Sequence, residues 1–581
     1  MFGKVLIANR GEIAVRVART CHELGVATVG VYSDVDSTAR HVRASDEAVH
    51  LPGVSPAETY LNLEAIIEAA RATGAEAVHP GYGFFSERAD AAEAFLSAGL
   101  VWIGPPPEAA RGVGDKVSAR RLASGAGVSV VPGTLEAVEG EGEVHAFGEA
   151  NGYPIAIKAA GGGGGRGLKV ARAADEVAAA LESAVREAEA WFGSPGVYLE
   201  RYLERPKHVE VQVLSPAPGG AMWVGARDCS LQRRHQKLVE ETPPPLFADA
   251  VPSMGAAAVA VANACGYVNA GTVEFLVDTE DGSFYFLEVN ARLQVEHTIT
   301  EEVTGLDLVA CQLRIAAGED LGFAQEDVLE GGRLAPRGHA IECRINAEDP
   351  ARGFAPGPGR IAAYDEPAGP GVRVDSGYGE GDEVPGAYDS LVAKLVVHAS
   401  TREEARRRML RALHEYRIEG VPTTIPAHLV LLDHPEFVDG SYTTRTLEAG
   451  ALDGLAAAGV RAGAGPDADG SGASGGQDAV LLVGGRPVRL WNRGMAASAP
   501  HATARDRGGS SNGVVTSPMH GTILQVDVSE GEEVAAGDPV AVLEAMKMET
   551  RVAAPRAGSV TAVHVSPGEV VEAGQPIADI G

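Results

Sequence analysis

The sequence predicts a multidomain protein of the α/β and α+β class that ends in a small all-β domain. Three observations support this prediction. The chain of 581 residues is too long for one hydrophobic core, its first residues alternate between strand and helix patterns, and its last residues form an internal repeat of short β-type runs. The two ends of the chain therefore belong to different fold classes.

The N-terminal region has the pattern of a doubly wound α/β layer. Residues 4–8 form an apolar strand pattern, Arg10 and Gly11 a turn, residues 13–24 a helical pattern and residues 27–32 a second strand. This alternation predicts a sheet with helices on its faces. The turn lacks the glycine pattern of dinucleotide-binding folds, so a dinucleotide site is not favoured.

Two segments near the C-terminus have the composition of linkers. Residues 456–477 and 494–513 are rich in Gly, Ala, Ser and Pro and contain no aromatic residue. They isolate an island, residues 478–492, in which two apolar runs flank Gly484 and Gly485 and predict a hairpin. A large N-terminal body and a small C-terminal domain lie on either side.

Composition excludes several classes of function. The formal net charge of −30 argues against nucleic-acid binding, which needs a basic surface. No run of 18 apolar residues indicates a membrane span, and the N-terminus lacks the pattern of a secretory signal. The 5 cysteines are scattered, which predicts a reducing cytoplasm and no structural zinc site.

The tail is built from two similar halves. Four turn residues each recur 37 positions later: Pro518, Gly521, Gly531 and Gly537 return as Pro555, Gly558, Gly568 and Gly574. Two equivalent halves of short strands predict a flattened β-barrel or sandwich with pseudo-two-fold symmetry. Lys547 lies at the junction of the halves between Met546 and Met548, where we expect an exposed hairpin tip. A lone lysine in a turn is usually only a surface charge, but the repeat and the methionines favour a modified lysine.

The segments 272–277 and 284–290 predict a hairpin that holds a cation. If the hairpin is centred on Asp281, then Glu274 lies opposite Glu288, and two facing carboxylates repel unless a cation or proton separates them. Oxygen ligands with Asn290 beside them suit Mg²⁺ or Mn²⁺. The alternative is a solvated outer face of the sheet.

A glycine-rich loop between two strand patterns predicts a phosphate contact. Residues 153–160 and 168–170 read as strands, and residues 161–165 are all glycine. Backbone N–H groups of such a loop can approach phosphate oxygens, although a glycine run can also be a simple flexible tip. Lys158 and Lys116 are candidate phosphate ligands, and either alone could be an ordinary surface lysine.

Both regions resemble known enzymes. Residues 517–581, with Ala545 to Met548 reading Ala-Met-Lys-Met, resemble the biotin carboxyl carrier domain, whose biotin is attached to the lysine. Residues 1–450 resemble the biotin carboxylase subunit of the ATP-grasp superfamily. The stretches that carry this second resemblance are residues 7–12, 79–83, 114–118, 227–237, 288–297 and 342–348. Together they indicate the alpha subunit of a biotin-dependent acyl-CoA carboxylase of the acetyl- or propionyl-CoA type.

The resemblance implies a division into domains. We expect an N-terminal α/β domain (1–114), an ATP-grasp domain (115–333) with a glycine-rich lid at about 131–204, and a C-terminal biotin carboxylase domain (334–450). Linkers (451–513) around a possible docking hairpin (478–492) lead to an all-β biotinyl domain (514–581).

The resemblance also assigns site residues. Those implied for ATP are Lys116, Lys158, Gly163, Gly164, Gly165, Glu200, Leu203, His208, Gln232 and His235. Those implied for the metal are Glu274, Glu288 and Asn290, and those for bicarbonate are Lys237, Arg292, Gln294 and Val295. Glu296 is the implied general base, and as an exposed carboxylate with a pKa of about 4.3 it is expected to be ionised at neutral pH. Arg292 and Lys237 are also implied in catalysis, and Arg344 would stabilise the biotin enolate. Biotin is expected on Lys547.

The implied reaction is the ATP- and bicarbonate-dependent carboxylation of biotin on the chain's own carrier domain. We expect a separate carboxyltransferase beta subunit, a biotin protein ligase as modifying partner, a hetero-oligomer, and a cytoplasmic role in fatty acid biosynthesis. Acetyl-, propionyl- and longer acyl-CoA substrates stay open. Two alternatives are an ATP-grasp carboxylate–amine ligase with an added carrier and a non-catalytic scaffold that presents biotin. A urea- or pyruvate-type carboxylase is disfavoured.

Overall fold

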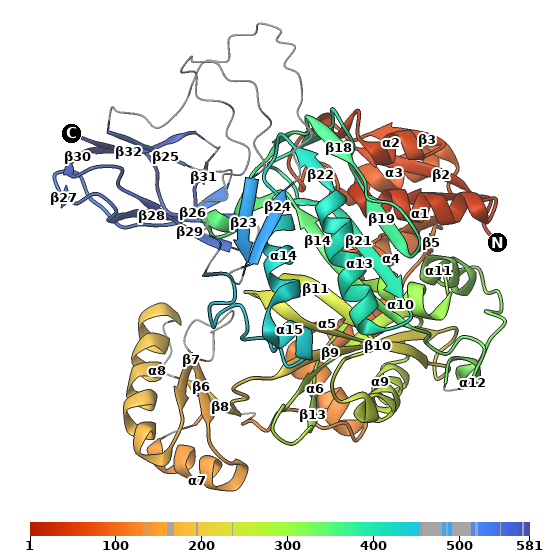
Figure 1. Cartoon of the computed structure of the whole chain (residues 1–581), viewed down its shortest axis with the longest axis horizontal. Coiled ribbons are helices and arrows are strands. Elements are labelled where there is room, and N and C mark those ends of the chain that lie inside the picture. The colour runs from red at the N-terminus through yellow and green to blue at the C-terminus, as the bar shows by residue number, and fades with distance from the viewer. Residues whose placement is uncertain are drawn as a thin grey trace, which may run out of the picture. The chain divides into compact units, whose positions relative to one another are not determined.

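The computed structural model describes most of the chain (Figure 1). The described residues are 1–134, 137–138, 140–159, 168–192, 196–234, 236–329, 331–453, 455, 479–483, 486–490, 513–517, 521–545, 548–571 and 574–581. One compact unit, the body, contains residues 1–355, 360–383 and 391–464; a second contains residues 356–359, 384–390 and 465–581. Within the described residues, no helix has the length and apolar character needed to cross a membrane.

The N-terminal part of the body is a doubly wound layer, as the sequence predicts. Its parallel sheet has the order β3-β2-β1-β4-β5. Val5, Leu6 and Ile7 are fully buried in the central strand, as expected for a parallel strand covered on both faces. The strands are β1 (Lys4–Ile7), β2 (Ala27–Tyr32), β3 (Glu47–His50), β4 (Ala77–His79) and β5 (Val101–Trp102), and the helices are α1 (Gly11–Glu23), α2 (Arg40–Ala44), α3 (Leu63–Thr73), α4 (Ala89–Ser97) and α5 (Pro107–Gly114).

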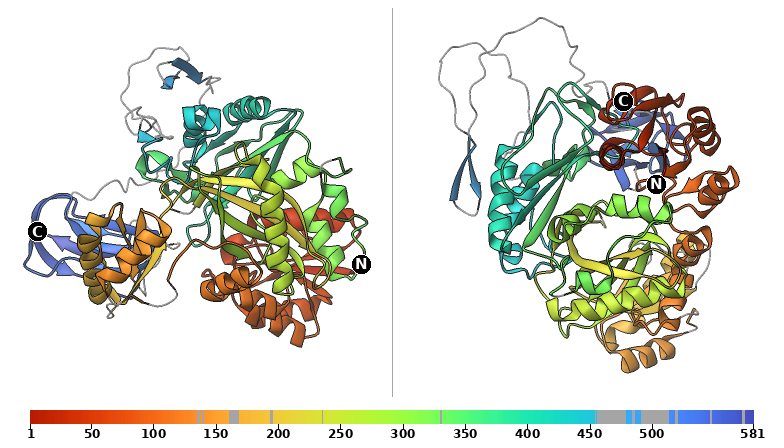
Figure 2. Two further views of the ribbon diagram at one scale, coloured as in Figure 1. Left: turned by 90° about the horizontal axis from the view of Figure 1, so that it is seen from below. Right: turned by 90° about the vertical axis from the view of Figure 1, so that its right-hand side faces the viewer.

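An antiparallel sheet of eight strands forms the centre of the body (Figure 2). Its order is β13-β12-β9-β10-β11-β14-β21-β19, so strands from the middle and the C-terminal third of the body share one sheet. The strands are β9 (Lys207–Ser215), β10 (Met222–Arg233), β11 (Gln236–Thr242), β12 (Asn269–Val277), β13 (Phe284–Asn290), β14 (His339–Asn346), β19 (Val372–Ser376) and β21 (Leu391–Ala399).

Helices cover this sheet. They are α6 (Lys116–Gly125), α9 (Val251–Ala264), α10 (His297–Thr304), α11 (Leu308–Ala316), α12 (Gln325–Val328), α13 (Arg402–Glu415), α14 (Ile425–Asp433) and α15 (Pro435–Asp439). Short strands complete the C-terminal part: β15 (Glu348–Asp349), β16 (Ala355–Pro356), β17 (Gly359–Arg360), β18 (Ala363–Asp365), β20 (Glu383–Val384) and β22 (Arg417–Glu419).

A smaller sheet stands within the segment predicted as a lid. Its order is β7-β6-β8, and the helices α7 and α8 pack beside it (Figure 1). The elements are α7 (Glu141–Asn151), β6 (Ile155–Ala159), β7 (Leu168–Ala171), α8 (Val177–Phe192) and β8 (Val197–Arg201). The predicted strands on either side of the glycine loop are confirmed. Gly163, Gly164 and Gly165 lie outside the described residues.

The tail consists of two sheets with the orders β25-β32-β30-β27 and β29-β28-β26-β31. The repeat explains this arrangement, because a shift of 37 residues carries β26 onto β30 and β27 onto β31, so each sheet is the counterpart of the other. The predicted flattened two-fold architecture is confirmed. The strands are β25 (Val514–Thr516), β26 (Gly521–Val526), β27 (Glu533–Val534), β28 (Pro539–Ala545), β29 (Met548–Ala553), β30 (Gly558–Val563), β31 (Val570–Val571) and β32 (Pro576–Ile580).

The two predicted hairpins near the C-terminus have the expected pairing. In the island, β23 (Ala479–Val483) pairs antiparallel with β24 (Arg486–Leu490). In the tail, β28 pairs antiparallel with β29 as far as Ala545 and Met548. Lys547 lies in the connection between these two strands and outside the described residues.

Candidate functional site

Three carboxylates lie side by side at the edge of the eight-stranded sheet. Glu274 of β12 is directly opposite Glu288 of β13, as predicted, and on its other side it is opposite Glu210 of β9. The register shifts by one residue just beyond Glu274, where Phe275 pairs with Phe286. The predicted register therefore holds at the site but not at the turn, because Leu287 is an extra residue in β13.

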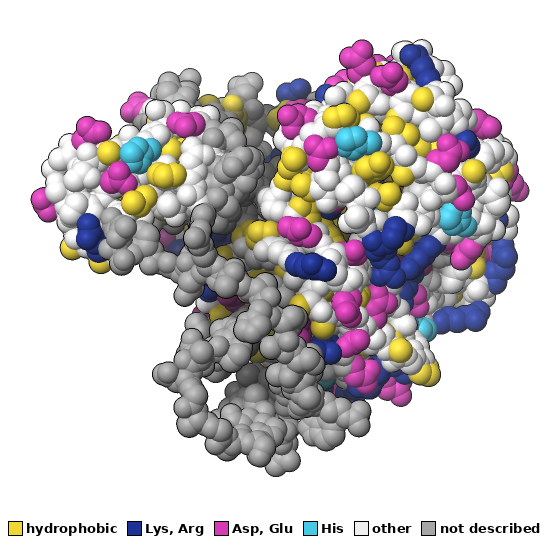
Figure 3. All heavy atoms as spheres, turned by 90° about the horizontal axis from the view of Figure 1, so that it is seen from above, with side chains coloured by type: hydrophobic (Ala, Val, Ile, Leu, Met, Phe, Trp, Pro, Cys, Tyr) yellow, Lys and Arg dark blue, Asp and Glu magenta, His cyan; other side chains and the backbone are white. Residues whose placement is uncertain are grey.

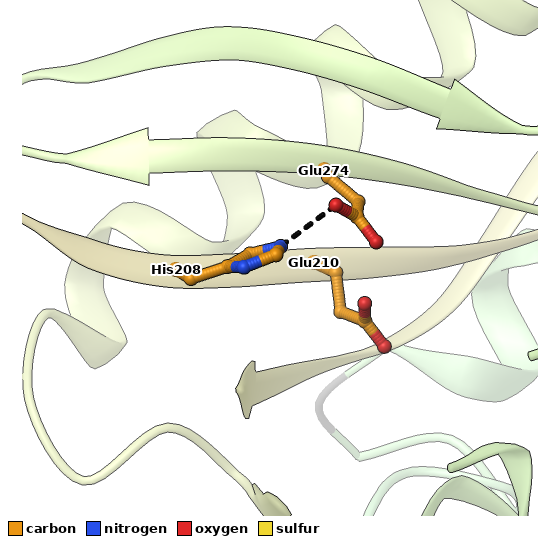
Figure 4. A group of neighbouring side chains, drawn as sticks. All are labelled: His208, Glu210 and Glu274. Carbon is orange, nitrogen blue, oxygen red and sulfur yellow. Dashed lines mark ion pairs between the residues drawn. The ribbon is translucent and has the colours of Figure 1, made fainter. Parts of the chain in front are cut away.

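Glu274 is surrounded by donors. Its Oε1 accepts hydrogen bonds from Lys237 Nζ at 3.0 Å and Asn290 Nδ2 at 2.8 Å, and also from Gln294 Nε2 at 3.1 Å. His208 Nε2 lies 2.8 Å from its Oε2 (Figure 4). Burial opposes ionisation, but Lys237 and His208 outweigh it and hold the pKa of Glu274 well below its usual value.

Lys237 is the centre of the cluster. Its Nζ lies 2.6 Å from Glu210 Oε2 and 2.6 Å from Glu296 Oε1, in addition to its bond with Glu274. Burial favours the neutral amine, but the three carboxylates hold the pKa of Lys237 well above its usual value. Lys237 is therefore a fixed cation whose charge is shared among three carboxylates.

Glu296 is buried between two cations. Its Oε1 binds Lys237, and its Oε2 accepts from Arg344 Nη2 at 2.9 Å. The sequence suggested an exposed carboxylate, which is wrong, because the side chain is fully buried. Its ionised state at neutral pH is nevertheless retained: burial raises the pKa, while Lys237 and Arg344 hold it well below its usual value. Arg344 is itself held by Glu240, whose Oε1 accepts from Nε at 2.6 Å.

Arg292 lies beside this cluster and contacts Asn290 and Gln294. Its Nη2 donates to Asn290 Oδ1 at 3.2 Å, and its Nη1 donates to Gln294 Oε1 at 2.9 Å. Glu87 Oε2 lies 3.2 Å from its Nε. The planar guanidinium is thus fixed on three sides, and such a group is suited to a carboxylate-like pair of oxygens.

The donor set at Glu274, Glu288 and Asn290 fits a divalent cation. The side chain of Glu288 is 37% exposed, and its Oε2 is 3.8 Å from Lys116 Nζ. Burial and the neighbouring Glu274 both raise the pKa of Glu288, so a cation between the two carboxylates would relieve their repulsion. Oxygen donors of this kind suit Mg²⁺ or Mn²⁺.

Lys158 and Glu200 form a second group, on the smaller sheet. Lys158 Nζ pairs with Glu200 Oε2, and Arg120 Nη1 lies 2.9 Å from the other oxygen of Glu200. Burial, with Arg120 and Lys116 nearby, lowers the pKa of Lys158 to about 8. Leu203 is buried just beyond β8. The structure thus places Lys158 on β6, Glu200 on β8 and Leu203 just beyond β8, so these predicted ATP residues belong to the smaller sheet.

Models of known families match four stretches of the chain. The biotin carboxylase N-terminal domain matches residues 1–110, and the carbamoyl-phosphate synthase L chain ATP-binding domain matches residues 115–324. The biotin carboxylase C-terminal domain matches residues 342–449, and the biotin-requiring enzyme domain matches residues 513–580. The biotin-dependent acyl-coenzyme A carboxylase alpha3 subunit of Mycobacterium leprae is 45% identical over 95% of this chain and 94% of that protein. The chain belongs to this family.

Biotin carboxylases without the tail match the body alone. Biotin carboxylase 1 of Bacillus subtilis is 47% identical over 77% of this chain and 98% of that protein. A crystal structure of the biotin carboxylase domain of Hydrogenobacter thermophilus 2-oxoglutarate carboxylase, in complex with MgADP, ADP and bicarbonate, is 46% identical. It covers 77% of this chain and 98% of that chain with a TM-score of 0.68. The chain is therefore an ATP-grasp biotin carboxylase that also carries a biotinyl domain.

Several residues that bind the side chains of the biotin carboxylase site were not predicted from the sequence. Glu210 and Arg227 form a fully buried ion pair at 2.5 Å, and Glu240 binds Arg344. Alternation along β9 could have found Glu210, because it shares the strand face of His208. No sequence pattern indicates Arg227, Glu240 or Glu87, because each contacts its partner only after the sheet or a distant loop has folded.

The remaining predicted residues divide into two groups. Gln232 of β10 is buried and lies opposite Lys237 of β11, and Val295 lies in the turn that contains Gln294 and Glu296. His235, like the three glycines of the loop and Lys547, lies outside the described residues. On the face drawn in Figure 3, acidic and basic side chains lie intermixed.

Proposed function

We propose that this chain uses ATP and bicarbonate to carboxylate biotin attached to its own Lys547, and that it supplies the carboxylated biotin to a separate carboxyltransferase subunit. The observation that carries the proposal is the buried cluster in which Lys237 and Arg344 hold Glu296 ionised. This is a base fixed next to cations that can bind an anionic substrate.

Bicarbonate would bind between Arg292 and Lys237. The guanidinium of Arg292 is held in place by Asn290 and Gln294, so its planar donors can pair with two bicarbonate oxygens. The side chain of Gln294 and the backbone N–H of Val295 are further donors. Positive charge here lowers the repulsion that an anion meets when it approaches a triphosphate.

Glu296 would act as the general base. With its pKa held low it is ionised at neutral pH, so it can accept the bicarbonate proton as an oxygen of bicarbonate attacks the γ-phosphorus of ATP. The bond to ADP breaks in the same step and carboxyphosphate forms, which decomposes to CO₂ and phosphate. The phosphate takes the N1 proton of biotin, and N1 then bonds to CO₂. Arg344, bound to Glu296 and Glu240, places a fixed cation where negative charge develops on the deprotonated biotin.

ATP would be bound by residues from both sheets. Lys116, Lys158, Glu200, Leu203, His208 and Gln232 are the proposed contacts, together with Gly163, Gly164, Gly165 and His235. Glu274, Glu288 and Asn290 would hold Mg²⁺ or Mn²⁺, which supplies charge neutralisation for phosphoryl transfer. A lid formed by about residues 131–204 would exclude water from carboxyphosphate, which hydrolyses readily.

The carrier arrangement implies partners. The alpha3 subunit from Mycobacterium leprae carries the name of an acyl-coenzyme A carboxylase, and by analogy the acceptor here is an acyl-CoA of the acetyl, propionyl or longer type. The partners would be a carboxyltransferase beta subunit and a biotin protein ligase, with the hairpin of β23 and β24 as the docking element for the beta subunit. All five cysteines are free thiols, which suits the reducing cytoplasm.

Nucleotide turnover by the biotinylated full-length chain tests the proposal. We expect ADP release to require bicarbonate and to increase with free biotin, and label from radioactive bicarbonate to appear on the wild-type chain but not on Lys547→Arg. Lys547→Arg should retain ADP release with free biotin, which makes it the matched control. ADP release that depends on neither bicarbonate nor biotin would refute the proposal and favour a carboxylate–amine ligase.

A further inference from the structure

The turn of Gln294, Val295 and Glu296 is held from its buried side by two side chains. His297 Nδ1 donates to the carbonyl oxygen of Gln294 at 2.8 Å, and Lys394 Nζ donates to the carbonyl oxygen of Val295 at 3.0 Å. A peptide group is planar, so fixing its carbonyl also fixes the direction of the N–H on its other side. His297 therefore orients the N–H of Val295, and Lys394 orients the peptide group that leads into Glu296.

Both side chains are fully buried. His297 is surrounded by Lys394, Arg16 and Arg373, and together with its burial they hold the pKa of His297 well below its usual value, so the ring is neutral. A carbonyl oxygen only accepts, and the neutral ring must therefore carry its proton on Nδ1. This tautomer makes the contact with Gln294 specific.

Lys394 lies in a row of charged residues across three strands. On β21 it is opposite Arg344 of β14 on one side and Asp375 of β19 on the other. Its Nζ lies 3.2 Å from Glu12 Oε2 and 4.0 Å from Asp375 Oδ2. A lysine with no exposed side-chain surface needs such partners, because an unpaired buried charge is strongly unfavourable.

The arrangement goes beyond an ordinary structural ion pair. Arg344 and Lys394 are neighbours across β14 and β21, and they bind consecutive residues of the same turn: Arg344 binds Glu296, and Lys394 binds Val295. Glu12 comes from α1 of the N-terminal layer and also accepts a hydrogen bond from the hydroxyl of Tyr82. The turn is thus connected to both the C-terminal strands and the N-terminal layer.

We propose that Lys394 is a positioning residue for bicarbonate: by holding the Val295 carbonyl it fixes the peptide group that leads into Glu296, and so keeps the carboxylate of Glu296 where it receives the hydrogen bond and then the proton of this substrate. Glu12 balances its charge, and His297 holds the preceding peptide group. Lys394 acts through the turn and does not touch the substrate itself. The inference rests on the proposed function, since it assigns a role in that same bicarbonate site.

The test uses a paired substitution, because Lys394→Met alone would leave Glu12 buried without its cation. In Lys394→Met/Glu12→Gln both charges are removed, while Asp375 keeps its ion pair with Arg373 at 2.7 Å. The matched control is Arg10→Met/Asp36→Asn, which removes another buried ion pair that begins at α1, with Nε 2.7 Å from Oδ2. Steady-state ADP release by the biotinylated full chain gives KM for bicarbonate and, separately, KM for ATP.

We expect KM for bicarbonate to rise about tenfold in the paired variant while KM for ATP changes less than about twofold, which corresponds to the loss of one charge-assisted hydrogen bond. The control pair should change neither KM. If KM for bicarbonate is unchanged in the folded variant, or if both KM values rise by the same factor, Lys394 is only structural and the inference fails.

If the paired variant does not fold, a second variant tests the inference. Lys394→Arg keeps a cation beside Glu12, but its wider planar group displaces the Val295 carbonyl, so the same selective rise in KM for bicarbonate is expected. An unchanged value would overturn the inference. Loss of bicarbonate dependence in the wild-type chain would instead refute the proposed function, so the two failures are distinguishable.

Discussion

The body and the tail differ in the charged groups that they bury. In the body, Lys237, Glu274 and Glu296 are buried within or beside the central sheet, and Arg344 is half-buried next to them. The tail core is aliphatic, with members such as Ile523, Val540, Leu543 and Ile577, and residues 513–581 contain no Phe, Tyr or Trp. The body fixes charged side chains in position, whereas the tail supports the two strands that precede and follow Lys547.

This difference determines how each region should respond to substitution. A buried charge is stable only while its partners remain, so a change inside the charged cluster acts first on chemistry and local electrostatics. An aliphatic core of a small domain depends on packed volume, so a truncation there acts on folding. Activity and carrier folding should therefore be separable by single substitutions.

The largest expected effect is the loss of the base. In Glu296→Gln the side chain keeps its size but cannot accept a proton, and bicarbonate-dependent ADP release should fall by about 10²- to 10⁴-fold. Lys237 keeps Glu210 and Glu274, and Arg344 keeps Glu240, so the variant should fold.

Glu302→Gln on α10 is the matched control for this change. Its carboxylate pairs with Arg373 at 3.3 Å and does not face the cluster, so turnover should stay near the wild-type rate. Equal turnover of Glu296→Gln and the wild type would show that another group removes the bicarbonate proton.

The next effect should appear in the tail alone. Leu543 of β28 is fully buried and lies between Ile523 of β26 and Thr550 of β29. Leu543→Ala should destabilise the tail by about 2–5 kcal/mol, enough to unfold a small domain and to abolish its biotinylation and streptavidin capture. ADP release with free biotin should be unchanged, because that reaction needs only the body.

Tryptophan fluorescence can separate the two regions in this experiment. Trp102, Trp191, Trp223 and Trp491 all lie outside residues 513–581, so the thermal transition of the body should be the same in Leu543→Ala and the wild type. Leu524→Ala, at a 37% exposed position on β26, should keep its biotin. If the tail stays folded after Leu543→Ala, the cavity that this substitution leaves costs less free energy than the tail's own stability.

The tail could be predicted almost completely from the sequence. Its repeat is local, with strands and turns spaced by 37 residues, and the matching glycines mark where each strand begins. The same locality allowed the pairing of Glu274 with Glu288 to be predicted, since both belong to one hairpin. The bulge at Leu287 was not predictable, because an extra residue leaves no mark in an apolar alternation.

The charged cluster of the body was predicted only in part. Lys237, Arg292, Gln294 and Glu296 could be named through the resemblance, but composition and periodicity alone gave them no partners. Lys394 was not found at all, because it meets Val295 only after β21 has paired with β14, 99 residues away from the turn. Contacts of this kind depend on tertiary packing, and burial also explains why the exposed state expected for Glu296 was wrong.

The smallest expected effect concerns two acidic residues near Arg344. Glu240 of β11 and Glu342 of β14 are directly opposite each other and fully buried. Burial, together with Glu240, raises the pKa of Glu342 well above its usual value, and burial raises that of Glu240 to about 7. Glu342 therefore keeps its proton to a higher pH in the folded chain than in the unfolded chain, where it ionises above a pH of about 4.3.

The sign of the pH dependence follows from this difference. Above a pH of about 4.3 the folded chain binds more protons at Glu342 than the unfolded chain, so the contribution of Glu342 to the stability of the wild type falls as the pH rises. Glu342→Gln resembles the protonated form and lacks this loss. Relative to the wild type, its body transition, followed by tryptophan fluorescence in urea, should become more stable as the pH is raised from 5 to 7. Parallel stabilities across this range would show that Glu342 is already ionised in the folded chain, and that a cation such as Lys394 neutralises it.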